Sequence, residues 1–248
     1  MFREMKAPSC PKIYASVIER VQSLGLPSGA KFLDAPCGDG EVSIELAKLG
    51  FEVSAVDMVD ELLPEARAAL GSCFRIADLT RPLPWPDASF DLILCVEGIE
   101  HVEDAFALLR EMHRLLKPGG ILIVTTPNII SLRSRMRFFG SGFYNCDPRP
   151  LDESARHPMH HIGLRTFPEL RYFLQTSGFQ LADVAATHTK PITYAYSVFA
   201  PWMWLYTLIA FRKEKSAAQR ERNKEIHRTL LSSAILYGEN LMLVSRKV

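Results

Sequence analysis

The 248-residue sequence predicts an α/β fold, and residues 31–57 carry the observations that predict it. This stretch opens with a short apolar run that fits a buried strand, followed by a turn that contains Gly38 and Gly40. Apolar side chains at helical spacing come next, and a second apolar strand then ends in Asp57. This order is typical of one half of a nucleotide-binding sheet: a strand, a glycine turn, a helix, a second strand and an acid.

The chemistry of the turn favours a positively charged ligand over a dinucleotide. Gly38 and Gly40 lack a Cβ, so backbone N–H groups can approach a ligand closely, and Asp57 can accept both hydroxyls of a ribose. Asp34, just before the turn, would repel a pyrophosphate but suits a cationic ligand that carries an amino acid. Ser43 stands where the usual dinucleotide pattern has its third glycine.

Five segments extend this pattern in one consistent order. They are LDAPCGDG, VSAVD, ADL at residues 77–79, SFDLILCVEGIEHVED and LLKPGGILIVTTPN. Together they resemble the motifs of class I S-adenosylmethionine (SAM)-dependent methyltransferases and cover about residues 30–128. Pro36 replaces the commoner glycine of the first motif, a small departure that the turn should tolerate.

The resemblance implies a fold, a cofactor and a set of cofactor contacts. The expected fold is a Rossmann-like, seven-stranded, mostly parallel sheet with an antiparallel last strand and helices on both faces. SAM is the expected methyl donor, with Asp78 on the adenine amino group and the Leu79 N–H on a ring nitrogen. The full set of expected cofactor-binding residues is Asp34, Ala35, Cys37, Gly38, Gly40, Asp57, Met58, Asp78, Leu79 and Val96.

The remaining helices and strands are predicted from the spacing of apolar residues and from the glycines and prolines that end such segments. The pattern predicts helices at residues 12–24, 58–70, 104–116 and 167–177, and strands at 74–77, 90–96, 121–126, 179–186 and 240–245. Pro64 either interrupts the second of these helices or sets its start. We expect a single domain over residues 1–248, with insertions at 127–166 and 187–238 that leave the same edge of the sheet and flank the substrate mouth.

Composition excludes several other classes of protein. A net charge of +1 gives no reason to expect a nucleic-acid partner. The five cysteines are odd in number and form no C-x-x-C pair, so we expect neither a disulfide framework nor a zinc ribbon. Residues 1–12 hold charges and prolines where a signal peptide needs an apolar run, which predicts a cytoplasmic protein.

The candidate catalytic residue is His101, in the run Glu97-x-x-Glu100-His101 just past the fourth strand. Parallel sheets bind ligands at the carboxyl ends of their strands, and histidine has a suitable proton affinity near neutral pH, so His101 can act as a general base. Alternatively, His101 caps the next helix or orients the loop. A third interpretation makes Glu97, Glu100 and His101 ligands of a divalent cation, as suggested for ubiquinone-type O-methyltransferases with a similar run.

The first insertion supplies further candidates. His157, His160 and His161 lie in it. The pair His160 and His161 could reach an acceptor, or these histidines could lie on the surface. Its arginines could clamp a phosphate or carboxylate of the acceptor, or form a solvated face. These arginines are Arg133, Arg135, Arg137, Arg149, Arg156 and Arg165.

The second insertion contains an almost wholly apolar run at residues 195–211, interrupted by Pro201 and followed by a basic segment up to residue 228. The run is short for a membrane-spanning helix, which needs about 20 apolar residues. Aromatic residues beside basic ones fit an interfacial helix, so we expect peripheral membrane contact through 195–228, on the inner face. The alternative is a buried helix or one that forms a homodimer.

The sequence therefore predicts a SAM-dependent methyltransferase that transfers a methyl group to a hydroxyl of a small or lipid-linked acceptor. The overall pattern resembles the small-molecule group that includes ubiquinone-biosynthesis O-methyltransferases. Two alternatives remain open at this stage. One is a nicotinamide-dependent oxidoreductase, and the other is a non-catalytic SAM-binding or membrane-associated scaffold protein.

Overall fold

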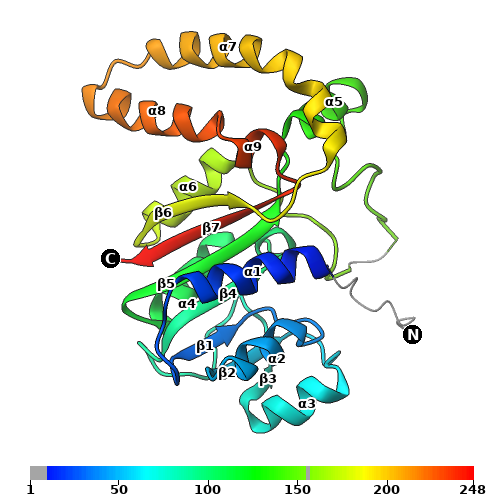
Figure 1. Ribbon diagram of the computed structural model, residues 1–248, viewed down its shortest axis with the longest axis vertical. Coiled ribbons are helices and arrows are strands. Elements are labelled where there is room, and N and C mark those ends of the chain that lie inside the picture. The colour runs from blue at the N-terminus through cyan, green and yellow to red at the C-terminus, as the bar shows by residue number, and fades with distance from the viewer. Residues whose placement is uncertain (1–9, 155–156) are drawn as a thin grey trace.

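The computed structural model describes residues 10–154 and 157–248; most of the segment on which the signal-peptide argument depends, and Arg156, lie outside them. Within these residues one seven-stranded sheet has the order β3-β2-β1-β4-β5-β7-β6 (Figure 1). The strands are β1 Lys31–Asp34, β2 Glu52–Asp57, β3 Phe74–Ile76, β4 Phe90–Val96, β5 Leu116–Pro127, β6 Phe179–Ala186 and β7 Asn240–Lys247.

Strand directions confirm the predicted fold class. Strands β1 to β5 pair in parallel, whereas β7 runs antiparallel to both β5 and β6, so that β6 has the direction of β5. Leu241 of β7 is the register partner of Thr126 on one side and of Ala186 on the other. The last residues of β5 and β6 therefore lie at one edge of the sheet, and both insertions leave from that edge.

Helices cover both faces of the sheet and bury their apolar stripes against it. They are α1 Pro11–Ser23, α2 Glu41–Lys48, α3 Pro64–Leu70, α4 Ala105–Leu115, α5 Leu132–Ser141, α6 Phe167–Thr176, α7 Ala200–Arg212, α8 Ala217–Leu230 and α9 Ser233–Tyr237. One core cluster joins α1, α2 and α3 to the sheet, and a second joins α4 and α6 to the opposite face.

The start of α3 resolves an alternative that the sequence left open, and the start of β5 differs from the prediction. Helix α3 begins at Pro64, so the proline sets the start of that helix; its missing N–H costs nothing in the first turn. Strand β5 begins at Leu116, five residues before the predicted start, because the KPGG segment continues the strand instead of separating it from α4. A change of register between Phe90 and Leu92 accommodates this extension.

The insertions contain more helix than the sequence indicated. The first holds α5, and in the second a 3₁₀ helix, η3 at Pro191–Phe199, is followed by α7 with Pro201 in its first turn. Helices α7 and α8 form a hairpin beyond the sheet (Figure 1). Glu225 on α8 accepts two hydrogen bonds of 3.0 and 2.9 Å from the guanidinium of Arg171 on α6, which anchors the hairpin.

Helix α7 is not buried within this chain, because Met203 is its one buried residue. This excludes the alternative of a helix buried within the chain. A surface helix and a helix at an interface between two copies remain. Among residues 10–154 and 157–248, no helix combines the length and the apolar composition that crossing a membrane requires.

Candidate cofactor and acceptor site

The glycine turn after β1 is held against the acid that ends β2. The Gly38 N–H donates a 2.9 Å hydrogen bond to one carboxylate oxygen of Asp57, and the Val59 N–H donates to the other at 3.2 Å. Gly38 has φ +52°, with open space where a Cβ would stand. At Gly40, with φ +81°, a Cβ would lie 2.5 Å from the Cβ of Ala66, so only glycine fits there.

Asp34 lies beneath this turn, and only 1 % of it is exposed. Its carboxylate accepts a 2.6 Å hydrogen bond from the Ser43 hydroxyl, which explains a serine in place of the third glycine. Burial raises the pKa of Asp34 to about 7, against the lowering effect of that hydrogen bond. A carboxyl with this pKa ionises readily when a cation binds close to it.

The other expected cofactor residues lie at the carboxyl ends of β1 to β4. Asp78 follows β3 and accepts hydrogen bonds from the Thr80 N–H and hydroxyl, at 2.9 and 2.7 Å. Next to it, the Ala77 N–H donates to the carbonyl of Asp57, which places the ends of β2 and β3 side by side. Ala35, Cys37, Leu79 and Val96 are buried at these strand ends, whereas Met58 is 55 % exposed.

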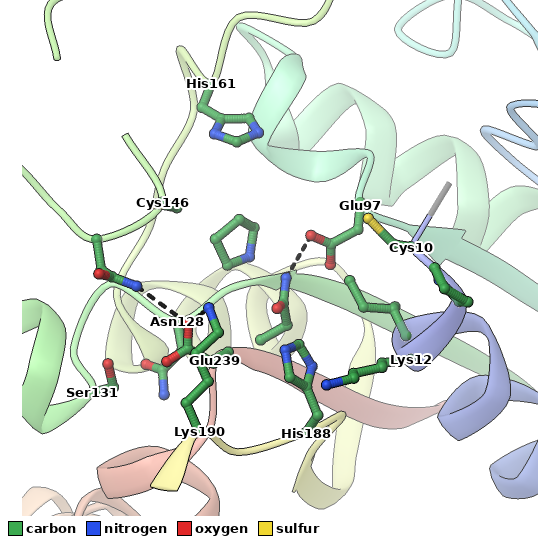
Figure 2. A pocket seen from close by; sticks show the side chains of 15 residues that line it. Cys10, Lys12, Glu97, Asn128, Ser131, Cys146, His161, His188, Lys190 and Glu239 are labelled. Carbon is green, nitrogen blue, oxygen red and sulfur yellow. Dashed lines mark hydrogen bonds and ion pairs between the residues drawn. The ribbon is translucent and has the colours of Figure 1, made fainter. Parts of the chain in front are cut away.

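Beyond this edge lies a cavity of about 460 Å³ that the N-terminal end of α1, the end of β4 and both insertions enclose (Figure 2). Glu97 lines it with a fixed carboxylate, which accepts 2.8 Å and 2.6 Å hydrogen bonds from Thr125 Oγ1 and Asn240 Nδ2. The residues around the cavity include Cys10, Lys12, Glu97, Asn128, Ser131, Asn145, Cys146, His161, His188, Lys190, Glu239 and Asn240.

Glu239, a mostly buried residue directly before β7, joins the two insertions at this cavity. Its carboxylate accepts hydrogen bonds from Lys190 at 2.7 Å, Asn145 at 3.2 Å and Arg133 at 3.3 Å. Lys190 belongs to the second insertion, whereas Arg133 and Asn145 belong to the first. At least one of the arginines expected to clamp an acceptor is therefore engaged with the protein itself.

The Glu97-x-x-Glu100-His101 run divides its side chains between two environments. Glu97 points at Thr125 and Asn240, whereas Glu100 is fully buried beside the side chain of Thr126. Burial raises the pKa of both acids, and the neighbouring charge of Glu97 raises that of Glu100 further. Among the described residues, ligand atoms of Glu100, His101 and His161 lie within 4.8 Å of one another, and Glu97 does not belong to this group.

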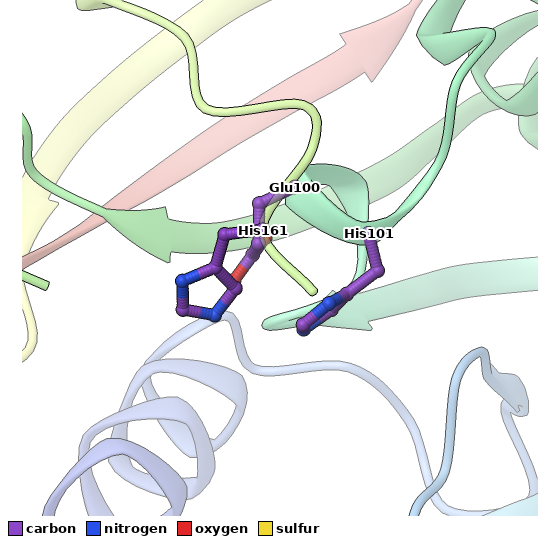
Figure 3. A group of neighbouring side chains, drawn as sticks. All are labelled: Glu100, His101 and His161. Atoms are coloured by element: carbon purple, nitrogen blue, oxygen red, sulfur yellow. The ribbon is translucent and has the colours of Figure 1, made fainter. Parts of the chain in front are cut away.

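His101 instead faces His161 of the first insertion, with ring centroids 4.8 Å apart (Figure 3). Its Nδ1 lies 3.2 Å from the carbonyl oxygen of His160, and the Nδ1 of His161 lies 3.0 Å from Asp147 Oδ2. Gly163 allows this approach, since a Cβ there would lie 2.8 Å from the Val102 carbonyl oxygen.

Sequence reasoning considered His161 only as one of three loop histidines, and it missed Asp147, Glu239 and Asn240. Of the other two histidines, His160 accepts a hydrogen bond from His101 through its carbonyl oxygen, and the ring centroid of His157 lies 5.6 Å from that of His160. Gly163, an isolated glycine two residues after the histidine pair, was the one local signal of a close backbone approach.

Comparison with known proteins decides the family. A family described as a methyltransferase domain matches residues 33–124. A protein of Xanthomonas axonopodis pv. citri named ubiquinone biosynthesis O-methyltransferase is 31 % identical over 179 residues, which cover 70 % of this chain and 72 % of that protein. The chain belongs to the class I SAM-dependent methyltransferases.

Solved structures agree with the fold. A SAM-dependent methyltransferase from Archaeoglobus fulgidus has a TM-score of 0.56 at 18 % identity and covers 94 % of each chain. The Burkholderia thailandensis 1,6-didemethyltoxoflavin-N1-methyltransferase, solved with S-adenosylhomocysteine, has the same TM-score and identity and covers 96 % of this chain and 78 % of that one. SAM is the methyl donor of this enzyme, which sets aside the nicotinamide and scaffold alternatives.

Asp57 is expected to contribute to SAM binding twice, through the ribose and through the position of Gly38. Asp57→Ala should weaken SAM binding by about 3 kcal/mol or more, because hydrogen bonds to a charged group contribute about 1.5–3 kcal/mol each. This corresponds to an increase in Kd of about 100-fold in isothermal titration calorimetry. Asp60→Ala, at an exposed acid paired with Arg67, is the matched control and should leave Kd unchanged. Equal affinity of Asp57→Ala and wild type would refute the assignment.

Asp34 should make SAM affinity depend on pH. Its pKa lies near 7 in the free protein, so below pH 7 the carboxyl is protonated and gives no charge to oppose the sulfonium. Affinity should therefore rise about tenfold from pH 6 to pH 8, with release of a proton on binding. Burial also raises the pKa of Asp57, which acts in the same direction. Calorimetry of Asp34→Asn should show a flatter profile; an unchanged profile would contradict the role of Asp34.

Proposed function

We propose that this enzyme transfers the SAM methyl group to a hydroxyl of a small or lipid-linked acceptor bound in the cavity that Glu97 and His161 line. The observation that carries this proposal is the position of that cavity, which begins at the residue directly after β4. Ligands of open α/β sheets bind at this edge, next to the cofactor. The names of the relatives that are about 31 % identical, as ubiquinone biosynthesis O-methyltransferases, support a hydroxyl acceptor.

A hydroxyl needs activation before it attacks the sulfonium methyl group, and His101 is suited to give it. Its Nδ1–H donates to the carbonyl of His160, which leaves a lone pair on Nε2. Burial and the nearby His161 lower the pKa of His101, so the imidazole is neutral near pH 7 and can accept a proton. The acceptor oxygen then forms a bond to the methyl carbon as the carbon–sulfur bond breaks, the proton passes to His101, and S-adenosylhomocysteine leaves.

Methylation should depend on His101 far more than SAM binding does. An acceptor is first identified by screening metabolite and lipid extracts with methyl-labelled SAM. We then expect His101→Ala to lower the transfer rate by about 100-fold or more, the range of general acid–base catalysis, with SAM affinity changed by less than about threefold. His157→Ala is the control and should keep the wild-type rate. Transfer only to amines, or a His101→Ala rate near that of wild type, would contradict the proposal.

A lipid-linked acceptor is supported by an apolar face of exposed side chains on the two insertions whose residues line this cavity. The face consists of side chains from α5, η3 and α7, namely Phe139, Val198, Trp202, Leu205, Tyr206 and Ile209. Phe139 is 87 % exposed and Trp202 and Tyr206 are 65 % and 68 % exposed, unusually high values for aromatic side chains. Helix α5 contacts η3, so the two insertions that line the cavity also build the apolar face.

The charge next to this face favours anionic lipid headgroups as its partner. Arg212, Lys213 and Lys215 follow the apolar residues directly, and each basic residue near such a surface contributes about 1 kcal/mol. Tryptophan and tyrosine are enriched at the level of lipid headgroups. An enzyme docked through this face could accept a hydroxyl whose lipid tail stays in the bilayer. The face would lie on the inner surface of the membrane, and the insertions would flank the substrate mouth.

Flotation with vesicles of phosphatidylcholine and phosphatidylglycerol tests the docking. Wild type should float with these vesicles and dissociate in part at high salt, because salt screens the basic residues. The variant with Trp202→Ser and Tyr206→Ser should stay at the bottom of the gradient. Tyr172→Ser removes an aromatic residue of similar exposure on α6 and should float as wild type does. A wild-type protein that does not float and sediments as a dimer would assign the face to a homodimer interface.

A further inference from the structure

The cavity proposed for the acceptor has a positively charged side that methyl transfer to a hydroxyl does not require. Lys12 on α1 and Lys190 in the second insertion line this side, with His188 between them in the view of Figure 2. Burial lowers the pKa of His188, and Glu239 opposes this effect. The charges of Lys190 and Lys12 lower the pKa of His188 further, so both ammonium groups lie close to this imidazole.

Glu239 does not neutralise this side of the cavity, because its carboxylate has two cations as partners. It accepts hydrogen bonds from Arg133 at 3.3 Å, from Asn145 at 3.2 Å and from Lys190 at 2.7 Å. One cation balances one carboxylate, so Arg133 and Lys190 together leave an excess of one positive charge. An ammonium group has three N–H donors, and Lys190 can therefore bind Glu239 and still donate to a ligand.

Lys12 adds a second positive charge that no acid balances. Within the described chain, no carboxylate pairs with its ammonium group. Lys12 lies in the first turn of α1, where the backbone N–H groups have no intrahelical acceptor and the helix end is positive. Helix α5 also begins at this cavity, through its N-cap residue Ser131. The positive ends of two helices thus add to the charges of the two lysines.

Glu97, the other acid among the described residues that line the cavity, lies toward the carboxyl end of β4. Its hydrogen bonds come from two uncharged side chains, Thr125 and Asn240. Burial raises its pKa to about 7, so a part of this group carries no charge near neutral pH. The cavity therefore has one end where the sheet presents Glu97 and another where positive charge exceeds negative charge.

We propose that the methyl acceptor carries an anionic oxygen group, a carboxylate or a phosphate, which Lys12 and Lys190 bind. Lysine binds such groups as a point charge with several donors. The sequence suggested the arginines of the first insertion for this task, but Arg133 is already bound to Glu239. The inference rests on the proposed function and names the class of its substrate, a hydroxyl compound with a negative charge. Binding at both ends of the cavity would orient the hydroxyl toward the methyl group.

The test compares three phenols of similar shape that bind to the full chain in its complex with S-adenosylhomocysteine. The probes are para-hydroxyphenylacetate, para-hydroxybenzylphosphonate and the uncharged para-hydroxyphenylacetamide. In isothermal titration calorimetry, we expect at least one anion to bind about tenfold or more tightly than the amide, because hydrogen bonds to charged groups contribute most. A rise in salt concentration from about 50 to about 500 mM should remove most of this difference. The anion that binds more tightly identifies the group as carboxylate or phosphate.

Two variants assign the preference to the lysines. Lys12→Gln and Lys190→Gln each remove one charge, and the amide of the second variant can still donate to Glu239. Both lysines are exposed to solvent, which limits the effect of each. Each variant should therefore weaken binding of the preferred anion by about three- to tenfold, and the double variant by about 30-fold, without a change for the uncharged amide.

Lys31→Gln is the matched control for these variants. The Lys31 side chain is 56 % exposed, against 48 % for Lys190, and it lies at the start of β1, at the other edge of the sheet. This variant should bind all three probes as wild type does. Thermal melts by circular dichroism show which variants are folded, and Lys12→Gln lies outside the hydrogen bonds of Glu239, so it tests the inference without disturbing them.

Three results would overturn the inference. The first is an uncharged amide that binds as tightly as both anions, and the second is a wild-type protein that binds neither anion below millimolar concentration. The third is a folded double variant with the anion affinity of wild type. If an uncharged hydroxyl compound is methylated at equal rates by wild type and the double variant, only this inference fails. If the lysines bind the anions but no hydroxyl is methylated, only the proposed function fails.

Discussion

The arrangement of this site depends on three carboxyl groups buried at the carboxyl ends of two adjacent strands. Asp34 ends β1, and Glu97 and Glu100 follow β4. Burial raises the pKa of all three, and each has different hydrogen-bond partners. Asp34 accepts from one hydroxyl, Glu97 accepts from a hydroxyl and an amide, and Glu100 has the Thr126 side chain beside it. Buried carboxyl groups whose pKa is raised become ionised when a cation binds near them, so this region is suited to the sulfonium of the cofactor.

A fourth acid, Glu239, whose side chain is mostly buried, holds together the two insertions that line the cavity. It sits at the turn into β7 and pairs with Lys190 and Arg133, one from each insertion. Ion pairs on a mostly buried carboxylate are hard to break on one side only, because the remaining charge would be left without a partner. Glu239 therefore links the two insertions, and it positions the cavity walls next to the sheet edge where the cofactor turn lies.

Sequence reasoning located the parts whose signals are local. Strands β4 and β6 have their predicted bounds, because the apolar run of β4 and the glycine that directly precedes β6 are short-range signals. The pairing of His101 with His161 and the role of Glu239 were not predictable in this way. They join positions about 60 and 106 residues apart, through an insertion whose path no periodicity encodes. The motif around Glu97 also could not reveal that the Glu97 carboxylate accepts hydrogen bonds from Thr125 and Asn240.

The second insertion shows why composition alone left the apolar run undecided. A run that is apolar on all sides fits a buried helix as well as an interfacial one, and only tertiary contacts decide between them. Pro201 divides the run, so η3 packs on α5 while α7 extends beyond the sheet and pairs with the basic helix α8. One side of α7 thus has a partner and the other does not. The unpartnered side carries the exposed rings of Trp202 and Tyr206, so the composition of the run cannot decide between a membrane surface and a second copy of the chain as the partner that covers it.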